Sequence, residues 1–115
     1  MLNKLKKLYA SIVVSFLLLL SSCSVVAAND EIIQRCTSQA TIAANIMEAR
    51  QNGAAIVRIF EVNKQFPEVK PLLDFFTTEA YKQPLYSSDT AKQQAIVEFS
   101  NTIFMTCMQH FDKVS

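Results

Sequence analysis

The longest uninterrupted amphipathic pattern in the chain covers residues 88–113. Ser88 can cap a helix, Asp89 favours its first turn, and no glycine or proline interrupts the residues after them. Apolar residues then recur at helical spacings on one broad face: Ala95, Ile96, Val97, Phe99, Ile103, Phe104, Cys107, Phe111 and Val114. The pattern predicts a long final helix that forms the central element of the core.

A first helix is predicted over residues 30–52. Asn29 or Asp30 can cap its beginning, and Gly53, the only glycine in the chain, stands where a left-handed C-terminal cap is expected. Its apolar face comprises Ile32, Ile33, Cys36, Ala40, Ala43, Ala44, Ile46 and Met47. The small residues on this face allow a neighbouring helix to approach closely.

Two shorter helices are predicted between these long ones. The first covers residues 54–66, with Ile56, Ile59, Phe60 and Asn63 on one face and Val57 and Phe66 at its borders. A strand over residues 55–62 is the alternative, but the apolar positions do not alternate strictly. The second begins at Pro71 and ends near Lys82, because Pro84 disfavours helix before it. Its apolar face comprises Leu72, Leu73, Phe75, Phe76 and Ala80.

The first 28 residues have the pattern of a bacterial secretory signal. Three lysines precede an apolar run over residues 12–20, and small residues come after it. Cleavage after Ala28 would leave residues 29–115 as a single helical domain. Two alternatives stay open: Cys23 ends a lipobox-like sequence and would then carry lipid, or residues 8–28 would remain as an uncleaved membrane anchor. The chain is therefore predicted to be exported, to the periplasm or to a lipid anchor on a membrane.

The cysteines of the exported part predict a disulfide. Cys36 and Cys107 both lie on apolar helical faces, and an oxidising compartment favours their pairing over two buried thiols. The predicted fold is therefore all-α, a small four-helix bundle whose first and last helices are joined by a disulfide. A short domain of this kind gains much of its stability from such a cross-link.

Charge and composition argue against several classes of function. Without the signal, the chain has eight basic and ten acidic residues, a formal charge of −2. It therefore lacks the excess of basic residues that is typical of proteins that bind nucleic acid or an anionic membrane. A metal site is not predicted, because the chain has a single histidine, His110, and no paired cysteine motif. No nucleophile motif or phosphate loop is present, and the acidic residues are scattered. We expect no enzyme activity, metal or cofactor.

Arg50 is the one charged residue that continues an apolar helical stripe. A buried guanidinium needs a partner, and Glu79, beside the apolar face of the third helix, is the candidate for a buried ion pair. The alternatives are that Arg50 extends to water near the helix end, or that it holds an anionic ligand. Tyr81 and Tyr86 flank Pro84 and are the candidate partner surface, although tyrosines beside a turn often only pack at its rim.

Cys36, Cys107 and the segments 46–53, 80–87 and 93–101 form a further pattern. In these residues the chain resembles a family of small exported, disulfide-bonded helical proteins of proteobacteria and their phages, which has no assigned function. The resemblance implies that Arg50, Gln51, Gly53, Tyr81 and Pro84 belong to the family's pattern, and it implies no catalytic residue. Residues 60–72 fit the pattern less well. The architecture is also similar to that of periplasmic immunity proteins, but no motif is shared.

The resulting hypothesis is a non-catalytic periplasmic binding module that engages another envelope protein. It would bind through a helix face or through the turn that carries Tyr81, Pro84 and Tyr86. An immunity protein against a periplasmic cell-wall-degrading effector is one form of this hypothesis. A periplasmic stress chaperone is an alternative. A ligand carrier is another, with a cavity lined by Phe60, Phe76, Phe99 and Phe104. Contact with a membrane is expected only through the signal or a lipidated Cys23, and the pattern does not determine an oligomeric state.

Overall fold

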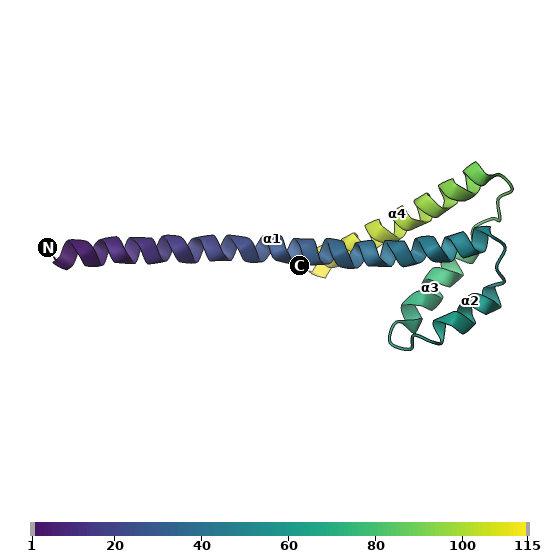
Figure 1. Cartoon of the computed structure of the whole chain (residues 1–115), viewed down its shortest axis with the longest axis horizontal. Helices are drawn as coiled ribbons and strands as arrows, with labels where there is room; N and C mark the ends of the chain where they lie inside the picture. The colour runs from purple at the N-terminus through teal and green to yellow at the C-terminus, as the bar shows by residue number, and fades with distance from the viewer. Residues whose placement is uncertain (1, 115) are drawn as a thin grey trace. The chain divides into compact units, whose positions relative to one another are not determined.

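The fold is all-α, as the sequence predicts. A computed structural model describes the backbone of residues 2–114 and the side chains of residues 2–8 and 29–113. The described backbone forms four helices and no strand (Figure 1): α1 (Leu2–Gln51), α2 (Ile56–Asn63), α3 (Lys70–Tyr81) and α4 (Asp89–Val114). The chain divides into two units, residues 1–34 and residues 35–115.

Residues 2–34 form the first part of α1. The prediction that Asn29 or Asp30 begins a helix is wrong, because no glycine or proline interrupts the preceding residues and the helix runs through both positions. Among the residues whose side chains are described, no helix is long and apolar enough to cross a membrane. Cys23, the candidate for lipidation, and the apolar run over residues 12–20 lie outside the described side chains.

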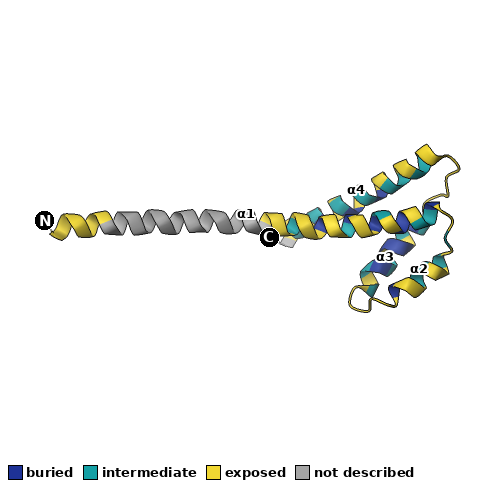
Figure 2. Cartoon of the chain, in the orientation of Figure 1, coloured by how far each residue is buried: buried dark blue, intermediate teal, exposed yellow. Residues whose placement is uncertain are grey.

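The second unit has one core, built from three helices. Its buried residues are Ala43, Ile46 and Met47 of α1, Phe76 and Ala80 of α3, and Phe99 and Ile103 of α4. Ile59 of α2 packs against this cluster. Phe76 and Phe99, which the ligand-carrier alternative places around a cavity, both belong to this buried cluster. Figure 2 shows the buried positions concentrated on α3 and along one stripe of α1.

Helices α1 and α4 run antiparallel within this unit, as three cross-connections show. The predicted disulfide is present between Cys36 and Cys107, whose Cα atoms are 5.5 Å apart. Further along, the Ser100 hydroxyl donates to the Ala40 carbonyl at 3.1 Å. At the other end, Lys92 Nζ donates to the Gln51 carbonyl at 2.9 Å. The disulfide therefore joins the first and last helices, as predicted.

A buried polar contact joins α2 to α3. The Asn63 side chain donates to Thr77 Oγ1 at 3.1 Å and to Asp74 Oδ1 at 3.0 Å. Asn63 and Thr77 are both buried. The second Asp74 oxygen accepts from Lys70 Nζ. These hydrogen bonds from Lys70 and Asn63 hold the pKa of Asp74 below its ordinary value of 3.8, although partial burial opposes the shift.

Several residues predicted on apolar faces are exposed instead. Four of them lie at the borders of their helical stripes, where a one-residue step turns a side chain by about 100° towards solvent, and the fifth, Phe66, lies after the end of α2. Ile33, Val57, Phe66, Phe75 and Val97 are the residues concerned. The predicted helix over residues 54–66 is too long, because α2 begins at Ile56 and ends at Asn63, where a turn comes next.

Candidate functional site

The C-terminal end of α1 is closed by a Schellman motif. Gly53 has a φ of +84°, a conformation that side-chain-bearing residues rarely adopt. Its N–H donates to the Arg50 carbonyl at 3.0 Å, and the next N–H, of Ala54, donates to the Ala49 carbonyl at 3.0 Å. A Cβ added at Gly53 would meet no atom within 4 Å, so the constraint is the backbone conformation alone. The predicted role of Gly53 as the cap is confirmed.

Gln51, in the last turn of α1, binds the loop between α3 and α4. Its side chain is 1% exposed. Nε2 donates to the Pro84 carbonyl at 2.9 Å, and Oε1 accepts from the Tyr86 N–H at 3.0 Å. Both ends of one buried amide are therefore satisfied by backbone groups of the same loop, which fixes the position of Tyr86.

Arg50 binds the same loop, and the predicted ion pair with Glu79 is not present. Its Nε and Nη2 atoms donate to the Gln83 carbonyl at 3.3 and 3.2 Å. Its guanidinium carbon lies 5.0 Å from the centroid of the Tyr81 ring, within range of a cation–π interaction. Glu79 instead accepts from Lys82 Nζ at 2.6 Å. A carbonyl and an aromatic face thus replace the carboxylate as the partners of this cation.

Tyr81 connects the end of α3 to the segment after α1. Its hydroxyl donates to the Ala54 carbonyl. Burial raises the pKa of Tyr81, and the nearby Arg50 charge opposes that shift. The residues Arg50, Gln51, Gly53, Tyr81 and Pro84, which we call the α1-end network, thus meet at one place. Tyr81 and Pro84, predicted as partner-binding residues, use their polar groups inside the fold.

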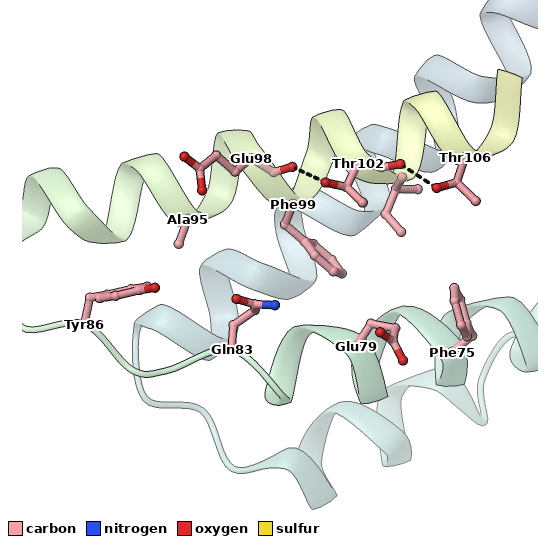
Figure 3. Close-up of a pocket in the computed structure, with 10 residues that line it drawn as sticks. Phe75, Glu79, Gln83, Tyr86, Ala95, Glu98, Phe99, Thr102 and Thr106 are labelled. Carbon is pink, nitrogen blue, oxygen red and sulfur yellow. Dashed lines mark hydrogen bonds between the residues drawn. The ribbon is translucent and has the colours of Figure 1, made fainter. Parts of the chain in front are cut away.

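Tyr86 lies at the mouth of a cleft of about 340 Å³ between α3 and α4. Figure 3 shows Tyr86 at one end and Phe75 at the other, with Phe99 between them. Tyr86 and Phe75 are 37% and 51% exposed, respectively. The cleft is lined by Phe75, Glu79 and Gln83 of α3 and the loop after it, by Tyr86, and by Ala95, Glu98, Phe99, Thr102, Ile103 and Thr106 of α4. It offers apolar contact surface with polar groups along its walls.

The charged side chains that line this cleft are both acidic. Glu79 belongs to α3 and Glu98 to α4. Glu79 is paired with Lys82, whereas the hydrogen-bond partner of Glu98 is the neutral side chain of Gln94, at 3.0 Å. No lysine or arginine is among the described residues that line it. The charge of the lining side chains is therefore negative, and it comes mainly from Glu98, which has no cationic partner among the described residues.

A second hollow, of about 410 Å³, lies between α1, α2 and the loop after α2. Eight of its ten lining residues are apolar, and the other two are asparagines: Ile42, Asn45, Ile46, Ala49, Ile59, Val62, Asn63, Phe66, Val69 and Leu73. Val62, Phe66 and Val69 are exposed there. None of the described residues that line this groove is charged, so it has less to orient a ligand than the α3–α4 cleft.

Sequence reasoning identified Tyr86 but missed Phe75, Glu98 and the cleft itself. Phe75 lies on the predicted apolar face of α3, so the pattern places it in the core, and Glu98 resembles an ordinary solvated charge. His110, near the end of α4, is exposed and packs edge-on against Phe111. Among the described side chains, no group of three or more histidine, cysteine, aspartate or glutamate residues is placed to hold a metal ion.

The α3–α4 cleft, lined at one end by the loop that the α1-end network binds, is therefore the candidate functional site. No family model, curated protein or solved structure matches this chain.

Proposed function

We propose that this chain is an exported, non-catalytic helical binding module, and that it engages another protein of the cell envelope through the α3–α4 cleft. The observation that carries the proposal is the position of Tyr86. A buried glutamine fixes the backbone of this residue, while its aromatic ring remains at the mouth of a cleft. A rigid aromatic on a fixed loop gains contact area at little cost in conformational entropy.

The composition of the cleft also supports binding to a protein segment. Phe75 and Tyr86 present exposed aromatic surface, and Phe99 and Ile103 provide an apolar floor. The Thr102 hydroxyl donates to the Glu98 carbonyl at 2.9 Å, and the Thr106 hydroxyl donates to the Thr102 carbonyl at 2.8 Å. The methyl groups of both threonines are left for apolar contact. Aromatic anchors with a polar surround are typical of interaction surfaces.

Two observations support export. Residues 1–28 have the pattern of a secretory signal, and a disulfide between Cys36 and Cys107 persists where the compartment is oxidising. We propose the periplasm as the location, with residues 29–115 as the mature four-helix bundle. A lipid on Cys23 would instead tether the same domain to a membrane.

Site-specific photocrosslinking in the cells that produce the protein tests this function. A photoreactive amino acid is placed at Thr102 inside the cleft, and, as the matched control, at Glu61 on the exposed face of α2. We expect one discrete adduct from position 102 that position 61 does not give. We also expect the combined F75A and Y86A substitutions to reduce that adduct by at least fivefold. Equal adducts from both positions, or none from position 102, would contradict the proposal.

A further inference from the structure

The charge of the cleft indicates what kind of segment it binds. Glu79 and Glu98 line it from opposite walls, and no cation is among its described lining residues. Two cations of the same unit donate to main-chain carbonyls and not to these carboxylates: Arg50 to Gln83, itself a lining residue, at 3.2 Å, and Lys92 to Gln51 at 2.9 Å. Lys82 neutralises one of the two glutamates, Glu79, at 2.6 Å. Within the described part of the chain, the other carboxylate, of Glu98, is left without a cationic partner.

The aromatic residues add a second preference for a cation. The Phe75 and Tyr86 rings are exposed at the two ends of the cleft (Figure 3), and the face of an aromatic ring attracts a guanidinium or an ammonium group. An arginine can pair with a carboxylate and lie on a ring at the same time, since its guanidinium is planar. Tyr81 and Arg50 already form such a cation–ring pair within this fold, at 5.0 Å.

We infer that the cleft accepts a cationic amphipathic segment of the partner protein, with an arginine or lysine directed to Glu98 and an apolar side chain seated on Phe99. The inference rests on the proposed function and adds the chemistry of the partner to it. A volume of about 340 Å³ is near the lower limit of small-molecule pockets, so the cleft holds a few side chains rather than a whole helix. The charge complementarity sets orientation and association rate more than affinity.

The test uses the full chain as purified from the cell envelope and short helical peptides of defined composition. The first peptide carries leucine and arginine on one face. In the second, glutamine replaces each arginine, and in the third, serine replaces each leucine. We expect the first peptide to shift the amide signals of Glu98, Thr102 and Tyr86 in nuclear magnetic resonance spectra. We expect each altered peptide to bind about three- to tenfold more weakly at low salt.

The Glu98→Gln variant provides the decisive comparison. It keeps the shape of the side chain and removes its charge, so the arginine peptide should bind about three- to tenfold more weakly while the glutamine peptide is unaffected. Glu61→Gln, on the exposed face of α2, is the matched control and should change neither affinity. Thermal unfolding of both variants checks that the fold is retained.

Three outcomes would overturn the inference: equal binding of the arginine and glutamine peptides, no binding of the arginine peptide, or shifts confined to the α1–α2 groove. Spermidine is the fourth probe, and binding as tight as that of the arginine peptide would identify a small polycation instead of a protein segment. A cleft-specific crosslinked adduct together with charge-independent peptide binding would leave the proposed function in place and remove only the cationic requirement.

Discussion

Gln51 shows how one side chain can determine the position of a loop. Its amide donates to the Pro84 carbonyl and accepts from the Tyr86 N–H, and it is 1% exposed. Gln51→Met keeps the length of the side chain and removes both hydrogen bonds, which leaves two backbone groups without partners. We expect a loss of about 2–4 kcal/mol in the free energy of unfolding, measured by urea denaturation.

Gln94→Met is the matched control for that substitution. Gln94 makes a single exposed hydrogen bond to Glu98, so its removal should cost no more than about 0.5 kcal/mol. A loss for Gln51→Met as small as that of the control would show that water replaces the lost partners and that the loop is not fixed by this residue.

The α1-end network also marks the limit of sequence reasoning at the scale of residues. The role of Gly53 could be predicted because a helix cap is a local requirement of the backbone. The partners of Arg50 and Gln51 could not, because they are main-chain groups of residues about 33 positions away. Every residue carries such groups, so no pattern of side chains distinguishes Gln83 or Pro84 as an acceptor. The search for a charged partner led to Glu79 for this reason.

At the scale of elements, the existence of the helices in the second unit follows from the sequence, but their exposed borders do not. Ser88 caps α4 as predicted, since its Oγ accepts from the Ala91 N–H at 3.1 Å. Phe75 and Val97 belong to apolar stripes and are nevertheless exposed. The width of a buried stripe depends on how closely the neighbouring helix approaches. At Phe75 the gap between α3 and α4 is the cleft, which no periodicity in either helix reveals.

The joint between α2 and α3 predicts a dependence of stability on pH. The pKa of Asp74 is held below its ordinary value of 3.8 in the folded state, chiefly by Lys70 and then by Asn63. The stabilisation from this carboxylate is therefore complete above about pH 4 and is lost as the pH falls through the lower, folded-state pKa. We expect urea denaturation to show a fall in stability below pH 4 that is smaller in Asp74→Asn.

Lys70→Met distinguishes the two causes of this shift. It removes the main hydrogen-bond donor and its charge but leaves the bond from Asn63, so its loss of stability below pH 4 should lie between those of the wild type and Asp74→Asn. Identical profiles for all three proteins would show that other groups control acid unfolding.

At the scale of the whole molecule, α1 and α4 are connected by the disulfide at one end of their antiparallel pair, by the Lys92–Gln51 hydrogen bond at the other, and by the Ser100–Ala40 hydrogen bond between them. The Cys36–Cys107 bond closes a sequence separation of 71 residues, and Lys92 reaches the Gln51 carbonyl at the other end of the same antiparallel pair. The pairing could be predicted because an exported chain with two cysteines on apolar faces has few alternatives. The positions of the two hydrogen bonds could not be predicted, because each depends on a main-chain acceptor.

The disulfide should supply a large share of the stability of the second unit. In the chain-entropy model, a loop of this length contributes roughly 4 kcal/mol, which is comparable to the net stability of a small domain. We expect the paired Cys36→Ala and Cys107→Ala substitutions to lower the free energy of unfolding by about 3–5 kcal/mol in urea denaturation. Thiol reduction of the wild-type protein should give a similar loss, and in the double variant reduction should change nothing further.

Hydrogen exchange should show which parts of the fold lose stability when the disulfide is removed. In the double variant, amides of α4 near Cys107 should exchange faster than the global loss of stability requires, because this end of α4 is no longer tied to α1. The amide of Tyr86 should show only the global loss, since its acceptor on Gln51 is unchanged. Exchange that accelerates equally at both ends of α4 would show that the connections at the two ends do not act independently and that α1 and α4 separate as one unit.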